Sequence, residues 1–439
     1  MTSGDTIFAV ASGFGRAGIA VIRISGPGTE AALHALVRGP APPPRRASLR
    51  RLHHPVTGEV LDQALVLRMA APGSFTGEDQ AELHIHGGLA VRSAVLRALS
   101  SLPGLRAAEP GEFTRRAFLN GRMDLSAVEG LADLIDAETE AQRRQALRQL
   151  EGALANKVDD WRDRLADALA LAEAGLDFTD EADVSHAASS EAAAIFHAVR
   201  LEIEDELARS SRAERLREGF VAVIAGPPNA GKSTLLNALA RREVAIVSPH
   251  PGTTRDAIEV RCDLDGLPVT FVDTAGLREA ADPVEGEGIA RARRHARGAD
   301  LVLWLVAPDA VADGESFGPV PVLNVATKSD LADRPPSADL AVSARTGDGI
   351  GRLVEAVRER AEAVLAGAGD AVVTRERHRK ALEEVVSALS RAEAAQAVGH
   401  EELAAEDLRL ALRALGRVTG RVDVEEILDR IFGQFCIGK

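Results

Sequence analysis

Residues Gly226 to Ser233 read Gly-Pro-Pro-Asn-Ala-Gly-Lys-Ser, and this stretch decides the fold around it. It matches the phosphate-loop pattern G-x-x-x-x-G-K-[ST], and it stands between an apolar run, Phe220 to Ala225, and a helix-like run, Thr234 to Arg241. Its glycines let backbone N–H groups turn toward an anion, and the helix N-terminus adds partial positive charge. Lys232 can reach the β- and γ-phosphates, and the Ser233 hydroxyl can ligate Mg²⁺. The stretch therefore predicts a nucleoside triphosphate site.

The composition is that of a soluble globular protein. Its 439 residues are enough for two to four domains at roughly 150 residues each. Hydrophobic residues make up 46% and charged residues 27%, both ordinary shares. The net charge of −14 disfavours stand-alone RNA binding, which depends on Lys and Arg facing phosphates. If RNA is involved, a local basic patch or a basic partner must help.

Cysteine usage and the start of the chain indicate the compartment. Cys262 and Cys436 lie far apart, so they form neither a disulfide framework nor a metal-site spacing, and they fit a reducing cytosol. Met1 to Asp5 lack the basic and apolar regions of a signal peptide. No apolar run approaches about 18 residues. We expect a cytoplasmic protein without a membrane span.

The spacing of apolar residues changes along the chain and predicts an α/β domain inserted into a helical one. Residues 1–120 read as α+β, with strand-like runs and two helix-like stretches near Thr29 to Leu36 and Leu89 to Leu99. Residues 121–216 and 371–439 show helical spacing with few breakers, and a break is expected at Asp177 to Asp180. In residues 217–370, short Val/Ile/Leu runs alternate with helices, as in a parallel α/β domain. The expected early strands are Thr6 to Ser12, Ile19 to Ser25, Leu61 to Met69 and Ala81 to His86.

Four short segments follow apolar runs in the order typical of guanine-nucleotide sites. Pro251 to Asp256 contains threonines that can complete Mg²⁺ coordination and sense the γ-phosphate. Asp273-Thr274-Ala275-Gly276 offers a carboxylate for Mg²⁺ and a glycine N–H for the γ-phosphate. Thr327-Lys328-Ser329-Asp330 ends in a carboxylate that can accept hydrogen bonds from guanine N1 and N2, a pair that adenine lacks. Ser343-Ala344-Arg345 is similar to the loop whose backbone contacts guanine O6.

Each of these segments alone is more often an ordinary loop, but the ordered set predicts guanine-nucleotide binding. It resembles the translation-factor-related GTPases across the whole inserted domain. The predicted GTP contacts are Asn229, Ala230, Gly231, Lys232, Ser233, Thr234, Ser248, Thr253, Thr254, Asp273, Thr274, Ala275, Gly276, Lys328, Asp330, Ser343, Ala344 and Arg345.

Thr327 departs from this pattern, because that family usually has Asn there. The Asn amide ties the base-binding loop to the phosphate loop, whereas Thr offers a shorter hydroxyl. We expect nucleotide affinity to fall by about 1 kcal/mol for a lost hydrogen bond. Guanine selectivity should persist because Asp330 is retained.

Hydrolysis needs a polar group from elsewhere, because Leu277 stands where Ras-like proteins keep a water-orienting Gln. In potassium-dependent relatives, the Asn equivalent to Asn229 ligates a monovalent cation that replaces an arginine finger. The segment Ile246 to Gly252 would then supply further oxygens. Glu285, on the segment Glu279 to Glu287, can position the attacking water, although it also reads as a solvated glutamate at a helix start.

Segments outside the inserted domain resemble one family, the tRNA uridine-modifying GTPases called MnmE or TrmE, from residue 5 to 439. The matching segments are Asp5-Thr6-Ile7, Gly15-Arg16, Arg23 to Gly26, Ser74 to Asp79, Gly111 to Gly121, Asp133 to Ala137 and Phe435 to Lys439. The resemblance implies an N-terminal folate-binding and dimerising domain, a discontinuous helical domain and an inserted Ras-like G domain. It also implies a homodimer whose G domains close on each other in a potassium-dependent way, driving GTP hydrolysis.

The same resemblance implies a reaction. With a flavin-dependent partner, MnmG (GidA), such proteins place a carboxymethylaminomethyl or aminomethyl group on C5 of the wobble uridine of certain tRNAs. The tRNA would bind mainly through the partner. A tetrahydrofolate derivative, 5,10-methylene or 5-formyl, provides the one-carbon unit.

The resemblance also carries residue roles onto this chain. It implies a catalytic role for Glu285 and Mg²⁺ ligation by Ser233 and Thr254. It also implies a set of folate contacts and a set of K⁺ ligands. The folate contacts would be Arg23, Glu82, Arg122 and Lys439, and the K⁺ shell would be Asn229, Ser248, His250 and Thr253. The family often has Lys where Arg122 stands, which keeps the charge and changes the geometry.

Some residues keep a second interpretation. Arg23, on a predicted strand, also reads as an outward-facing solvated charge. Cys436 is either a nucleophile in one-carbon chemistry or a small apolar residue beside Phe435 and Ile437. Cys262, in a strand, is interpreted as structural.

Two other classes of protein compete with this interpretation. A ribosome-assembly GTPase would carry an RNA module with a Gly-x-x-Gly loop. Gly15-Arg16-Ala17-Gly18 fits that pattern, but it lies in a β-rich segment, and the −14 charge disfavours it. A non-catalytic nucleotide switch would show negligible turnover at high K⁺.

Overall fold

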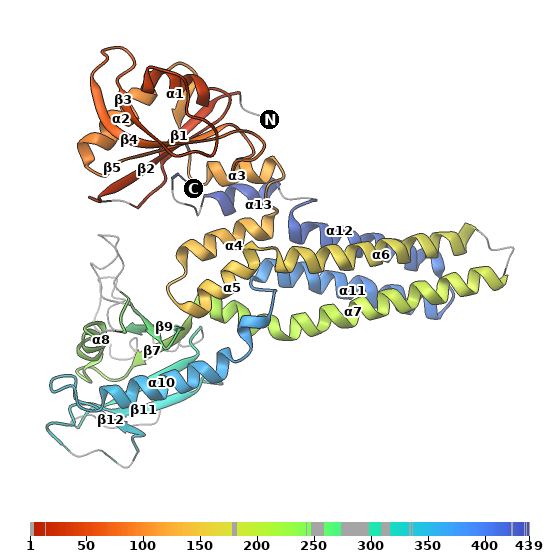
Figure 1. The fold of residues 1–439 in the computed structure, drawn as a ribbon. Coiled ribbons are helices and arrows are strands. Elements are labelled where there is room, and N and C mark those ends of the chain that lie inside the picture. Colours follow the sequence, from red (N-terminus) through yellow and green to blue (C-terminus); the bar gives the residue numbers. More distant parts are fainter. Residues whose placement is uncertain are drawn as a thin grey trace, which may run out of the picture. The chain divides into compact units, whose positions relative to one another are not determined.

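The computed structural model describes residues 4–13, 15–177, 182–242, 244–246, 259–273, 298–308, 317–332, 335, 337–422, 425–433, 435 and 437–438. The chain divides into two units, which we treat separately: Met1–Ala132 with Gly416–Lys439, and Asp133–Leu415. Figure 1 shows the elements of both units. No helix in the part of the chain that the structure describes combines the length and apolar character needed to cross a membrane.

The first unit is built on a sheet whose described strands run in the order β3-β4-β5-β2-β1-β6. Neighbouring strands are antiparallel except β1 and β6, which are parallel. The strands are β1 (Thr6–Val10), β2 (Ile19–Ser25), β3 (Ser48–His53), β4 (Val60–Met69), β5 (Gln80–His86) and β6 (Leu105–Ala107). The four strands expected from the sequence are present, and β3 and β6 were not predicted.

Alternation along these strands sends every second side chain into one core. Ile22 and Ile24 of β2 and Leu83 of β5 are fully buried, whereas the residues between them are half-exposed. Helices α1 (Thr29–Val37) and α2 (Leu89–Ser100) add Leu33, Leu36, Val95 and Leu99 to this core. The α+β class expected for this part of the chain is confirmed. The Gly15-Arg16-Ala17-Gly18 turn lies between β1 and β2 rather than between helices, which excludes the KH-type interpretation.

The C-terminal residues belong to this first unit. α3 (Glu112–Leu119), the first part of α4 (Leu125–Asp136) and α13 (Glu425–Phe432) share a cluster with Phe432 and Phe435. Gly438 has a φ of +98°, and a Cβ placed there would lie 2.0 Å from the Val10 carbonyl oxygen, so only glycine fits. The end of the chain is therefore held against strand β1.

Buried charges hold the loop between β4 and β5. Arg116 is 7% exposed and pairs with Glu78 at 3.1 Å, Glu112 at 3.0 Å and Asp5 at 3.0 Å. Burial alone would raise the pKa of Glu112, but hydrogen bonds from Arg106 and Arg116 outweigh it and hold the pKa below its ordinary value. The pair of Arg116 with Glu78 ties the segment Ser74 to Asp79 to α3.

The second unit contains long helices and a second sheet. The helices are α5 (Glu140–Leu150), α6 (Ala153–Asp177), α7 (Ala182–Glu218), α11 (Glu376–Ala397) and α12 (Glu401–Thr419), whose last residues belong to the first unit. In Figure 1, α6, α7 and α11 lie side by side, as helices with apolar residues at helical spacing are expected to pack. The break expected at Asp177 to Asp180 falls largely outside the described residues.

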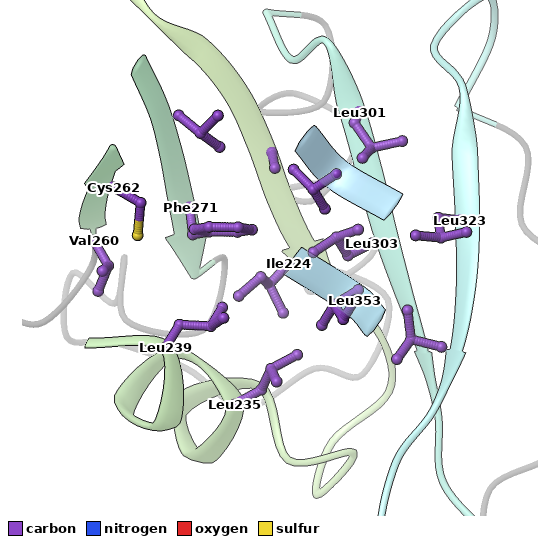
Figure 2. Packing of buried hydrophobic residues seen from close by; sticks show 14 of the residues in the cluster. Ile224, Leu235, Leu239, Val260, Cys262, Phe271, Leu301, Leu303, Leu323 and Leu353 are labelled. Atoms are coloured by element: carbon purple, nitrogen blue, oxygen red, sulfur yellow. The ribbon is translucent and has the colours of Figure 1, made fainter. Parts of the chain in front are cut away.

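The second sheet has the order β12-β11-β10-β7-β9-β8, and all its neighbours are parallel except β8 and β9. Its elements are β7 (Phe220–Ala225), α8 (Lys232–Ala240), β8 (Glu259–Leu264), β9 (Leu267–Asp273), β10 (Leu301–Val306), β11 (Val322–Ala326), β12 (Leu340–Ala341) and α10 (Ile350–Leu365), followed by the 3₁₀ turn Ala368–Asp370. Figure 2 shows α8 and α10 packed on one face through Ile224, Leu235, Leu303 and Leu353. Trp304 and Phe317 pack on the opposite face, with ring centroids 5.6 Å apart. The α/β class expected here is confirmed.

Truncating the centre of this sheet core should destabilise it. Leu303→Ala removes a fully buried side chain and is expected to lower the free energy of unfolding by about 2–5 kcal/mol. Urea unfolding followed by Trp304 fluorescence measures this in a Trp161→Phe background, because the chain has 2 Trp. Leu331→Ala is the control, since Leu331 is 72% exposed and should change stability by no more than about 0.5 kcal/mol. Equal unfolding midpoints for the two variants would contradict this packing.

Candidate nucleotide site

The phosphate loop connects β7 to α8 through backbone conformations that its sequence favours. Gly226, Asn229 and Gly231 have φ values of +149°, +61° and +91°. Asn tolerates the left-handed region better than most residues. A Cβ at Gly226 would lie 2.8 Å from the Leu305 carbonyl oxygen of β10, so glycine lets the loop pass close to that strand. The helix begins at Lys232, two residues earlier than the expected Thr234, so its N-terminus directly adjoins the loop.

Lys232 is held across this loop. Its Nζ donates to the carbonyl oxygens of Gly226 and Pro227, each at 2.9 Å. Burial lowers the pKa of Lys232, and the negative charge of Asp273 opposes that shift. A partly buried ammonium whose partners are two neutral carbonyls is well placed to pair with an arriving anion, which is a stronger partner.

Ser233 and Asp273 come together at the carboxyl ends of two parallel strands. The register of β7 and β9 pairs Ile224 with Asp273, so the end of β9 lies beside the phosphate loop. The Ser233 Oγ donates to Asp273 Oδ2 at 2.6 Å, and Asp273 is fully buried. A hydroxyl and a carboxylate at this position are the hard oxygen ligands that Mg²⁺ prefers, so this pair fits the ion.

The loop after β11, Thr327 to Asp330, holds Asp330 as a hydrogen-bond acceptor. Its Oδ1 accepts from Ser343 Oγ at 2.7 Å, and its Oδ2 accepts from Arg345 at 2.9 Å (Nε) and 2.7 Å (Nη2). Hydrogen bonds from Ser343 and then Arg345 hold the pKa of Asp330 below its ordinary value. Ser343 is fully buried, whereas the side chain of Arg345 is 75% exposed. Lys328, in the same loop, has a φ of +56°.

Thr327 ties this loop to the phosphate loop. Its Oγ1 donates to the Ala230 carbonyl oxygen at 2.8 Å, across 97 residues of sequence, and the group is buried. The expectation that Thr would lose this hydrogen bond is wrong. The short hydroxyl reaches because Ala230 is fully buried against the strand ends, which brings the two backbones close.

Several predicted residues lie outside the described residues. They are Ser248, His250, Thr253, Thr254, Thr274, Ala275, Gly276, Leu277, Glu285, Cys436 and Lys439. Asn229 is described and is exposed on the loop, and Thr234 is exposed on the first turn of α8. Within the described part of the chain, His, Cys, Asp and Glu side chains form no cluster of the kind that binds a metal. Cys262 is buried in the sheet core, and burial raises the pKa of its thiol to about 12, as expected of a structural cysteine.

In the first unit, two of the predicted folate contacts face each other. Arg23 of β2 and Glu82 of β5 are direct cross-strand partners, with Nη2 and Oε1 3.0 Å apart. The Arg23 guanidinium also lies over the rings of Phe75 and Phe113, 5.5 and 5.7 Å from their centroids. At 21% exposure and with these partners, Arg23 is not a solvated outward charge. Arg122 lies beside the loop that contains Phe75 and Gly77, because a Cβ placed on Gly77 would be 3.2 Å from the Cγ of Arg122.

A phosphate loop after β7, a serine–aspartate pair beside it and a carboxylate on a second, tethered loop define a P-loop nucleotide-binding protein. Models of two families match this chain: the GTP-binding protein TrmE N-terminus over residues 6–122 and the MnmE helical domain over residues 125–436. The chain therefore belongs to the MnmE (TrmE) family.

Similar proteins support this assignment. A Methylobacterium sp. protein is 65% identical over 99% of this chain and 100% of its own length. A Methylorubrum populi protein is 60% identical over 99% of this chain and 98% of its own length. Both are named tRNA modification GTPase MnmE. Among solved structures, the G domain of the T. maritima FeoB iron transporter matches 32% of this chain and 98% of its own, at 20% identity and a TM-score of 0.23, too weak a likeness to support an inference.

The Thr327 tie should contribute to nucleotide binding. Thr327→Val removes the hydroxyl at nearly constant volume, and GDP affinity is expected to fall by about 1–2 kcal/mol, a factor of about 5–30. Displacement of a fluorescent GDP measures the change. Thr327→Ser keeps the hydroxyl and should bind GDP like the unchanged chain. If the valine and serine variants bound GDP equally well, the hydrogen bond to Ala230 would carry no binding energy.

Proposed function

We propose that this chain binds and hydrolyses GTP as part of tRNA modification, the activity in the names of its relatives. The observation that carries the proposal is the hydrogen bond from Thr327 to Ala230, which joins the phosphate loop and the base loop into one site. Asp330 lies on the same loop as Thr327. Its carboxylate accepts hydrogen bonds at neutral pH, as the N1–H and N2–H groups of guanine require.

Different residues of the site would bind the phosphates, the Mg²⁺ ion and the base. Backbone N–H groups of the phosphate loop and the N-terminus of α8 would hold the β- and γ-phosphates, and Lys232 would exchange its two carbonyl partners for phosphate oxygens. Ser233 and Asp273 would hold Mg²⁺, with Thr254 as a further ligand. The bound ion neutralises charge on the phosphate oxygens. Asp330 would select guanine over adenine.

The hydrolytic step is proposed to use K⁺ and Glu285. Asn229 is exposed on the phosphate loop at a positive φ, which suits a side chain that binds an ion beside the triphosphate. Ser248, His250 and Thr253 would complete the shell. Ras-like proteins orient the attacking water with a Gln, and this chain has Leu277 at that position. Glu285 would orient the water instead.

The one-carbon chemistry is proposed for the first unit. Arg23 and Glu82 offer a cation and a carboxylate side by side, which suits a pterin ring that both donates and accepts hydrogen bonds. Arg122 lies beside the loop that includes Phe75, and Gly438, the residue before Lys439, contacts β1 next to the Val10–Ile22 pair. A tetrahydrofolate derivative is the proposed ligand. The chain would act as a homodimer with a flavin-dependent partner on the wobble uridine of tRNA, with domains at residues 1–120, 121–216 with 371–439, and 217–370.

The overall function is tested by nucleoside mass spectrometry of tRNA from a strain that lacks the gene. C5 modification of the wobble uridine should disappear and should return with the unchanged gene. A gene carrying Arg23→Gln should not restore it, whereas Arg97→Gln, which removes an exposed charge from α2, should. Unchanged C5 modification in the deletion strain would refute the proposal.

The cation and Glu285 are tested by GTP turnover in matched K⁺ and Na⁺ buffers. We expect K⁺ to raise turnover at least about 10-fold, and Glu285→Ala to abolish most of that turnover, since positioned acid–base groups contribute at least about 100-fold. Glu279→Ala, in the same segment, is the control and should retain activity. Equal rates in the two salts, or full activity of Glu285→Ala, would sink this mechanism. Negligible turnover in both salts would favour a non-catalytic switch.

A further inference from the structure

One stretch of this acidic chain is strongly basic. Residues 31–58 contain five Arg and three His and no Asp or Glu, in a chain whose net charge is −14. The segment covers the end of α1, the loop that follows it, strand β3 and the turn after it. Non-specific attraction to phosphates depends on such local charge rather than on the net charge of the chain.

The five arginines surround the edge of the first sheet, and we call them the β3 basic edge: Arg38, Arg45, Arg46, Arg50 and Arg51. β3 ends the strand order of its sheet, so no described strand covers its outer side. All of these arginines are exposed except Arg50, which is half-buried on the helix-covered face. Arg51 comes five positions after Arg46, which spans at most roughly 17 Å at about 3.3 Å per extended residue.

Their charges are not neutralised within the described residues. None of the five forms an ion pair there; Arg45 donates to the Gly73 carbonyl and Arg50 to the Leu49 carbonyl. Arg116, by contrast, faces three carboxylates in the same unit.

Two acidic residues on elements that neighbour β3 have partners outside the β3 basic edge. Asp62, on β4, accepts from the backbone N–H and ring of His86, both at 2.8 Å, and Glu30 pairs with Arg68. Burial alone would raise the pKa of Asp62, but the hydrogen bonds from His86 outweigh it and keep the carboxylate ionised. Glu59 is the first acid in the sequence after the basic stretch.

Charged residues on an edge strand often serve only to prevent pairing with another sheet edge. That purpose explains Arg50 and Arg51, which lie on β3 itself. It does not explain Arg38, Arg45 and Arg46, which precede the strand. A row of uncompensated guanidinium groups that continues beyond the strand is instead suited to a polyanion, because each planar fork can bind phosphate oxygens in pairs.

We propose that the β3 basic edge binds the phosphate backbone of the tRNA substrate. The inference rests on the proposed function, which supplies an RNA substrate to a chain that is otherwise acidic. Repulsion from the rest of the surface would orient the RNA, so that this edge provides the chain's own contact with it.

The test is tRNA binding by the full chain, measured by fluorescence anisotropy across a KCl series. The triple variant Arg45→Gln, Arg46→Gln and Arg51→Gln should weaken tRNA binding at least about 10-fold at 0.1 M salt. Each phosphate contact that is removed should lower the affinity by a factor of a few. The slope of log K against log[salt] should also fall by about 2–3, close to one per contact. The control triple variant Arg97→Gln, Arg241→Gln and Arg352→Gln removes the same charge from other exposed positions and should bind like the unchanged chain.

The outcomes separate this inference from the proposed function. No tRNA binding by the unchanged chain, or equal loss in both triple variants, overturns the inference, while GTP turnover and wobble-uridine modification would still support the function. Binding of the unchanged chain to vesicles with anionic phospholipid, with tRNA binding unaffected by the triple variant, also overturns it in favour of a membrane surface. A GTP turnover rate that stays unchanged in the triple variant shows that the substitutions have not unfolded the chain.

Discussion

The parallel pairing of β7 with β9 and β10 is the constraint on which the nucleotide site depends. Parallel strands end at the same edge of a sheet, and here the register places Ile224 beside Asp273 and Ala225 beside Trp304. β11 is parallel to β10, so the phosphate loop, the Asp273 carboxylate and the loop after β11 all lie at the same edge of the sheet. The apolar side chains of Ile224, Leu303 and Phe271 maintain that register, so the packing of the core and the geometry of the site have one cause.

The sequence predicted this region well because its motifs are local. Gly226 to Ser233 specify a turn, a strand before it and a helix after it, and each can be recognised without knowledge of contacts. The contacts between segments that are distant in the sequence were harder to predict. The Thr327 hydroxyl bonds to a carbonyl 97 residues away, and its reach depends on how closely two backbones approach, which no pattern encodes.

The missed elements have similar explanations. β3 carries Arg50 and Arg51 side by side, which hides the alternation of an edge strand, and β6 is only three residues long. The cross-strand pairing of Arg23 with Glu82 follows from a register that the sequence of neither strand reveals. Arg23 alone reads as a surface charge, and only its position beside Glu82, Phe75 and Phe113 distinguishes it.

In the proposed function, one carboxylate, that of Asp330, decides which base the site accepts. The most direct measurement is the affinity of the unchanged chain and of Asp330→Asn for GTP and for xanthosine triphosphate. Two hydrogen bonds to a charged group contribute about 1.5–3 kcal/mol each, so the substitution is expected to weaken GTP binding at least about 100-fold. Xanthosine triphosphate binding is expected to strengthen, because the amide can donate to the xanthine 2-oxo group. An unchanged preference for GTP in the variant would show that Asp330 does not select the base.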